Sequence, residues 1–143
     1  MFKYVKYMLM VMILGISFVT FQQIAQADDE VVNATQVASF QKISPEYAKQ
    51  LMDTEKNYII IDVRTTEEYN EGHVKNAISL PNEEIVVDSE KVATILPNKD
   101  QMLLVYCRSG KRAAEASIKL VNMGYTNVYS FGGIIDWPYE IVK

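Results

Sequence analysis

Cysteine and histidine are almost missing from this chain. Its 143 residues contain one cysteine and one histidine, which excludes an intramolecular disulfide and a zinc site built from several such ligands. A Cys-x-x-Cys redox pair is excluded for the same reason. Excess positive charge is also lacking, because the formal net charge is −4. Binding to nucleic acid needs a basic face, so we expect no nucleic-acid partner. With so few cysteine and histidine residues, any chemistry must depend on a small number of side chains.

The first residues have the pattern of an export signal. Lys3 and Lys6 precede an uncharged, mostly apolar run over 7–21, and Ala25-Gln26-Ala27 has the small residues that signal peptidase accepts. The run is shorter than the roughly 20 residues of a comfortable transmembrane helix. An uncleaved membrane anchor is the alternative. Cleavage would remove two positive charges and change the net charge from −4 to −6.

These observations divide the chain into three parts. We predict a signal peptide at 1–27, a polar leader at 28–42 and one domain at 43–143. The mature protein is then exported across the cytoplasmic membrane, to a periplasm, the cell envelope or the medium. We expect it to be a monomer without stable membrane insertion.

Helix and strand patterns alternate along the predicted domain. Ser44-Pro45-Glu46 is typical of a helix start, and Thr65 to Glu68 has the spacing of a capping box. The continuous apolar run at 58–63 suits a strand buried on both faces. Further strands are predicted at 77–80, 102–106 and 128–131, and helices at 82–96, in one or two pieces, and 113–123. This alternation favours a parallel α/β domain.

The solitary cysteine follows one of these buried strands. The strand delivers Cys107 to the carboxyl edge of the sheet, where open α/β folds bind ligands. Arg108, Lys111 and Arg112 lie within five residues of it, ahead of a helix. Helix N-termini and neighbouring cations stabilise thiolates and attract anions. We therefore expect an exposed, nucleophilic thiolate in an anion-binding loop. The alternative is an inert thiol buried in the core.

The residues around this loop resemble those of single-domain rhodaneses, which are sulfurtransferases. The resemblance covers roughly 43–137 and rests on motifs spread along that range: Asp62-Val63-Arg64, Glu68-Tyr69, Gly72-His73-Val74, Ala77-Ile78, Leu80-Pro81, the loop from Cys107 to Arg112, Phe131-Gly132-Gly133 and Trp137. It implies a five-stranded parallel sheet flanked by helices. It also implies transfer of a sulfane sulfur through a persulfide on Cys107, from a small anionic donor such as thiosulfate to a thiol or cyanide.

The resemblance further assigns roles to individual residues. Cys107 is the catalytic residue, and the substrate-binding residues are those that follow it: Arg108, Ser109, Gly110, Lys111, Arg112 and Ala113. Asp62, Arg64 and His73 are expected to be structural. No metal or organic cofactor is required.

Two other functions share the loop chemistry. A cysteine phosphatase or arsenate reductase uses a Cys-x5-Arg loop, but the sixth position after Cys107 is Ala113, and Arg112 comes one residue early. The shorter loop favours a sulfur atom over a tetrahedral oxyanion. A persulfide carrier that serves a partner protein without turnover would use the same loop, and the sequence leaves that alternative open.

Overall fold

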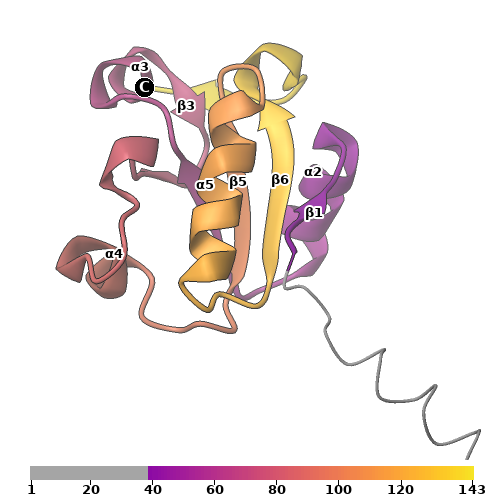
Figure 1. Cartoon of the computed structure of the whole chain (residues 1–143). Coiled ribbons are helices and arrows are strands. Elements are labelled where there is room, and N and C mark those ends of the chain that lie inside the picture. The colour runs from indigo at the N-terminus through magenta and orange to yellow at the C-terminus, as the bar shows by residue number, and fades with distance from the viewer. Residues whose placement is uncertain (1–38) are drawn as a thin grey trace, which may run out of the picture. The chain divides into compact units, whose positions relative to one another are not determined.

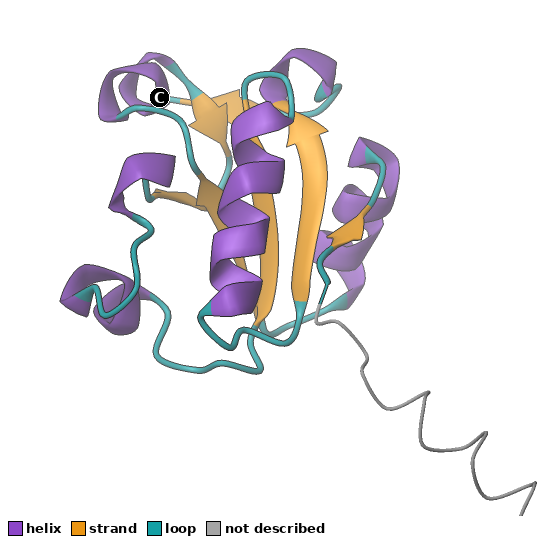
Figure 2. Ribbon diagram, viewed as in Figure 1, coloured by secondary structure: helices purple, strands orange, loops and turns teal. Residues whose placement is uncertain are grey.

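The described residues form an α/β domain around one parallel sheet, whose strands are two to six residues long. The computed structural model describes residues 39–143, so the predicted signal peptide and most of the predicted leader lie outside the described residues. The five strands of the sheet lie in the order β1-β6-β5-β2-β4, and all four strand pairings within it are parallel. The expectation of a five-stranded parallel sheet flanked by helices is confirmed (Figures 1 and 2).

The elements follow one another with short connections. The sheet strands are β1 (Gln41–Lys42), β2 (Tyr58–Asp62), β4 (Ala77–Ser79), β5 (Met102–Cys107) and β6 (Val128–Gly133). The helices are α2 (Pro45–Thr54), α3 (Thr66–Glu71), α4 (Glu90–Ile95) and α5 (Lys111–Asn122), with 3-10 turns η1 (Asn82–Glu84) and η2 (Ile134–Asp136). A separate antiparallel pair joins β3 (His73–Val74) to β7 (Ile141–Val142).

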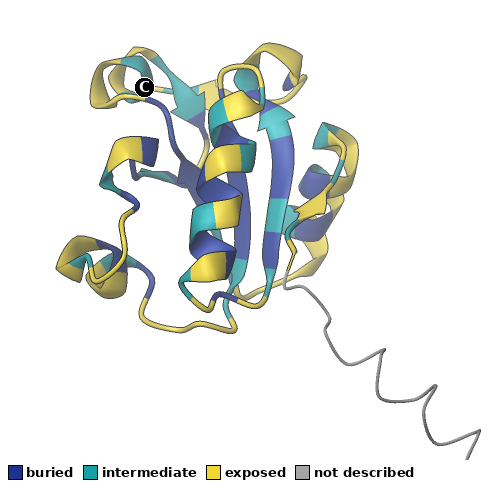
Figure 3. Ribbon diagram, viewed as in Figure 1, coloured by how far each residue is buried: buried dark blue, intermediate teal, exposed yellow. Residues whose placement is uncertain are grey.

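The central strands bury both of their faces. Successive side chains of a strand point to opposite faces, so Leu103 and Val105 of β5 join one apolar cluster and Leu104 joins another. Helix α5 covers the first face, packed against β5 and β6, and α2 packs on the second (Figure 1). The inward surface of α5 is buried while its outward surface is exposed (Figure 3).

Local sequence signals account for most element boundaries. The side chain of Ser44 caps α2, and Thr65 and Glu68 form the predicted capping box at the start of α3. The predicted helical region at 82–96 forms two pieces, η1 and α4. Helix α5 begins two residues earlier than expected, so Lys111 and Arg112 lie in its first turn.

Three two-residue strands were not predicted from the sequence. These are β1, β3 and β7, and β1 falls within the stretch assigned to the leader.

Between residues 39 and 143, no helix is long and apolar enough to cross a membrane.

Candidate active site

Cys107 is the last residue of β5, at the carboxyl edge of the sheet and in its central strand. The expectation that its thiol is exposed is wrong, because the residue is only 1% exposed. The reason is strand alternation: Cys107 shares a face with Val105, and this face is covered by α5 through Ala113. The chain after Cys107 then turns directly into α5.

A backbone amide contacts the buried sulfur. The N–H of Gly110 donates to Cys107 Sγ over 3.0 Å. Gly110 adopts a left-handed conformation with φ of +103°, which glycine takes without steric cost, and it is the N-cap of α5. The N-terminus of α5, which is the positive end of the helix dipole, therefore lies beside the sulfur.

The end of β6 supports the loop from the other side. Gly133 lies so close to the loop that a Cβ there would be 2.1 Å from the carbonyl oxygen of Arg108 and 2.6 Å from Cα of Ser109. The N–H of Ile135 donates to that same carbonyl over 3.3 Å. The backbone that follows Cys107 is thus held between β6 and α5.

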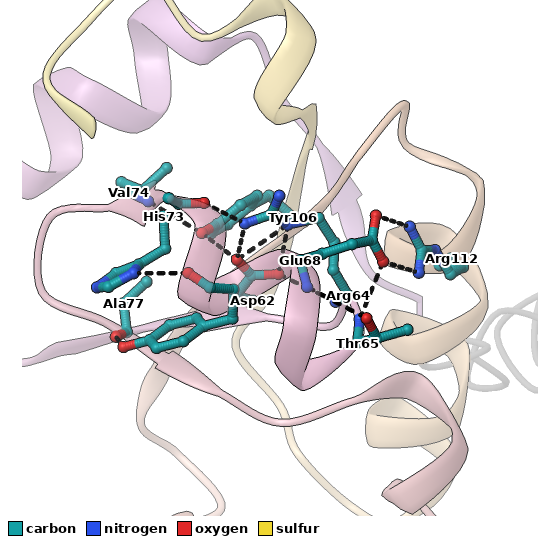
Figure 4. A network of polar contacts seen from close by, with 11 residues as sticks. Asp62, Arg64, Thr65, Glu68, His73, Val74, Ala77, Tyr106 and Arg112 are labelled. Atoms are coloured by element: carbon teal, nitrogen blue, oxygen red, sulfur yellow. Dashed lines mark hydrogen bonds and ion pairs between the residues drawn. The ribbon is translucent and has the colours of Figure 1, made fainter. Parts of the chain in front are cut away.

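The three cations of the loop have different surroundings. Arg108 and Lys111 are exposed, whereas the guanidinium of Arg112 donates two hydrogen bonds to the carboxylate of Glu68, at 2.7 and 2.9 Å (Figure 4). The bond from Arg112 lowers the pKa of Glu68 to about 2. Sequence spacing did not reveal this pair, because 44 residues separate its partners.

The remaining predicted loop residues line the same turn. Ser109 is exposed and Gly110 is partly buried, whereas Ala113 in the first turn of α5 is fully buried. Two exposed cations, Arg108 and Lys111, and the exposed Ser109 thus follow the buried cysteine in the chain.

A buried polar network lies at the ends of β2 and β5. Asp62 and Arg64 form an ion pair with an N···O distance of 2.7 Å, and Arg64 also donates to the carbonyl oxygen of Gly72 over 2.6 Å (Figure 4). The hydroxyl of Tyr106 donates to Asp62 over 2.5 Å and accepts from the N–H of Val74. Burial, followed by the hydrogen bond to Asp62, raises the pKa of Tyr106. The network joins the ends of β2 and β5 to Gly72 and to Val74 of β3.

His73 contacts α3 through its ring and β7 through its backbone. Its ring stacks on Tyr69 with centroids 3.8 Å apart, and Nδ1 lies 3.0 Å from the carbonyl oxygen of Tyr69. Its backbone pairs with Val142 of β7. These contacts are consistent with a structural role for His73, as for Asp62 and Arg64. Within residues 39–143, no three His, Cys, Asp or Glu side chains are grouped to hold a metal ion.

Fold and site together define a class: an α/β domain with one cysteine at the end of a central strand, joined to a helix by a short turn and flanked by cations. The rhodanese-like domain model matches residues 44–138. The chain belongs to the rhodanese family, and it is a rhodanese-type sulfurtransferase.

Individual relatives agree with this assignment. The chain is 41% identical over 83 residues to thiosulfate sulfurtransferase PspE of Escherichia coli, covering 58% of this chain and 77% of that protein. It is 34% identical over 95 residues to a sulfurtransferase of Allochromatium vinosum, covering 66% and 83%. A solved structure described as a rhodanese with anions from E. coli has 38% identity and a TM-score of 0.55, with 60% of this chain and 98% of that chain covered. Two longer curated relatives also match, and the chain spans 31% and 24% of their length.

Proposed function

We propose that the protein takes a sulfane sulfur from thiosulfate, holds it as a persulfide on Cys107 and passes it to a thiol or to cyanide. The observation that carries this proposal is the 3.0 Å hydrogen bond from the Gly110 amide to Cys107 Sγ at the N-terminus of α5. It supplies a fixed donor for a charged sulfur without any metal or cofactor. The name of the PspE relative supports thiosulfate as the donor.

The first half of the reaction forms the persulfide. The Cys107 thiolate attacks the outer sulfur of thiosulfate, a new S–S bond forms, and the bond between the two sulfurs of thiosulfate breaks. Sulfite leaves with the electron pair, and the negative charge stays on the outer sulfur of the persulfide. The exposed Arg108 and Lys111 would attract the dianion, and the loop amides would stabilise the persulfide.

The second half regenerates the thiolate. The sulfur of a thiol acceptor, or the carbon of cyanide, attacks the outer sulfur of the persulfide, and the S–S bond breaks with its electron pair going to Cys107 Sγ. The proton of a thiol acceptor ends on the product persulfide. This is covalent catalysis in two steps, for which ping-pong kinetics are expected.

Arg112 is included in this proposal as a positioning residue of the loop. Its two hydrogen bonds to Glu68 anchor the first turn of α5 to α3. A charge engaged in this way is less available to surround an oxyanion, which adds to the loop-length argument against phosphatase chemistry.

Intact mass spectrometry tests the proposal. After incubation with thiosulfate and removal of the excess, the protein should gain one sulfur atom, and a thiol or cyanide should remove it. Cys107→Ser is the control and should gain none. Absence of the adduct, or its presence on the Ser variant, would refute persulfide chemistry at Cys107. Multiple turnovers with cyanide separate an enzyme from a stoichiometric carrier.

We further propose that the protein is exported and cleaved after Ala27. The support is the basic, apolar and small-residue order of the first 27 residues. N-terminal sequencing of the protein from the extracytoplasmic fraction should begin at Asp28. A chain that retains Met1 and stays in the membrane fraction would support the uncleaved anchor instead.

A further inference from the structure

A groove lies along one flank of the catalytic loop. Its volume is about 560 Å³, within the range of small-molecule sites. It is lined by Ser109, Gly110 and Lys111, and by residues 130–132 of β6. Gly110 thus both lines the groove and donates a hydrogen bond to Cys107 Sγ.

The path of β1 accounts for the groove. β1 pairs with only Tyr129 and Ser130 of β6, and after Ile43 the chain turns away into α2. The last residues of β6 therefore have no strand beside them on this flank. Lys42 and Ile43, at the end of β1 and just after it, also line the groove.

The other flank of the loop is occupied. There the Arg112 guanidinium donates two hydrogen bonds to Glu68 of α3. A molecule larger than the transferred sulfur has room for its body on the β1 flank.

The charges of the groove indicate what fits there. Lys42 and Lys111 line it and are exposed, and neither forms an ion pair within residues 39–143. One acid, Asp136, lies at its edge. The walls between these charges include the apolar side chains of Phe40 and Ile43. The groove is thus a partly apolar channel with an excess of one positive charge.

From this geometry we infer that the groove binds the sulfur acceptor, and that the acceptor is a small thiol carrying a carboxylate, with Lys42 as the residue that selects the negative charge. This inference rests on the proposed persulfide mechanism. The carboxylate faces Lys42, the apolar stem lies along the groove, and the thiol reaches the outer sulfur of the persulfide beside Gly110. Lys42 acts on acceptor binding and has no role in forming the persulfide.

Ping-pong kinetics allow the two halves to be measured separately, because kcat/KM for each substrate reports its own half-reaction. The experiment uses Lys42→Gln with three acceptors: 3-mercaptopropionate, neutral 2-mercaptoethanol and cationic cysteamine. We expect kcat/KM for 3-mercaptopropionate to fall about two- to fivefold, as for loss of one exposed charge contact. The value for 2-mercaptoethanol should not change, the value for cysteamine should not fall, and kcat/KM for thiosulfate should not change.

Two controls make the test specific. Lys56→Gln removes an exposed lysine ahead of β2, at the opposite edge of the sheet, and should change none of these values. Lys42→Glu should enlarge the loss with 3-mercaptopropionate, and raised salt should shrink it. Equal kcat/KM for 3-mercaptopropionate in Lys42→Gln and wild type, or an equal loss for all three thiols, would overturn the inference. Failure of the persulfide proposal is distinguishable, since it abolishes the mass adduct in wild type.

Discussion

Replacing Gly133 by alanine should displace the catalytic loop while leaving the backbone of β6 unstrained. Gly133 has an extended conformation, with φ of −129°, that alanine also adopts. The added Cβ, however, would lie 2.1 Å from the carbonyl oxygen of Arg108, where carbon and oxygen normally stay about 3.3 Å apart. The loop must therefore move by about 1 Å. That shift would disturb the contact between the Gly110 amide and Cys107 Sγ.

The expected effect on activity is larger than the effect on folding. A misplacement of about 1 Å in a catalytic group can lower the rate about a hundredfold, and overpacking typically costs about 1–3 kcal/mol of unfolding free energy. We predict that Gly133→Ala lowers kcat/KM for thiosulfate about a hundredfold, at temperatures where denaturant titration shows it to be folded. Full activity per folded molecule would refute the claim that Gly133 positions the loop.

Gly124→Ala is the matched control. Gly124 has a left-handed φ of +90° and its Cβ would meet nothing within 4 Å, so alanine there costs about 1–2 kcal/mol through the backbone alone. It follows α5, a 12-residue helix about 18 Å long whose other end carries the loop. This variant should lose stability and keep its kcat/KM.

Two further predictions concern the charged pairs around the site. Asp62→Asn leaves the buried Arg64 guanidinium without its counterion, so the free energy of unfolding should fall by about 3–5 kcal/mol in urea titrations; a loss below about 1 kcal/mol would contradict a stabilising role for the pair. Glu68 has a pKa lowered from 4.5 to about 2, so its pairing with Arg112 stabilises the fold fully above pH 4.5 and this stabilisation disappears as the pH falls toward 2. Solvent reaches both side chains, so Glu68→Gln should cost only about 1 kcal/mol at pH 7, and the difference from wild type should vanish near pH 2; a difference independent of pH would show that the carboxylate charge is not its source.

The parallel sheet and the position of the cysteine were predictable because their signals are local. The apolar residues that form β2 are consecutive in the sequence, and the two residues of the capping box, Thr65 and Glu68, are three positions apart. The two-residue strands β1, β3 and β7 carry no periodicity, and only their partners far along the chain define them. The early start of α5 depends on the left-handed Gly110, for which the sequence offers no side-chain cap.

The site differs from expectation where residues distant in sequence meet. The sequence alone makes Arg112 look equivalent to Arg108 and Lys111, because all three follow Cys107 closely. Its pairing with Glu68 depends on how α3 lies against the start of α5. The burial of Cys107 depends on the covering helix and not on the polar residues that follow it in sequence. Likewise, the need for glycine at position 133 is visible only when β6 lies against the loop.

Two properties of Cys107 bear on the order of the proposed sulfur transfer: its burial and the absence of a second cysteine among the 143 residues. A sulfur that is 1% exposed is most accessible to a small donor such as thiosulfate. Once the persulfide forms, its outer sulfur lies one S–S bond, about 2 Å, further from the cysteine and within reach of a larger acceptor. The 143 residues contain no second cysteine to take that sulfur, which favours an external acceptor in the proposed mechanism. The open β1 flank of the loop, lined by Lys42 and Lys111, is the side from which an acceptor with a negative charge can approach.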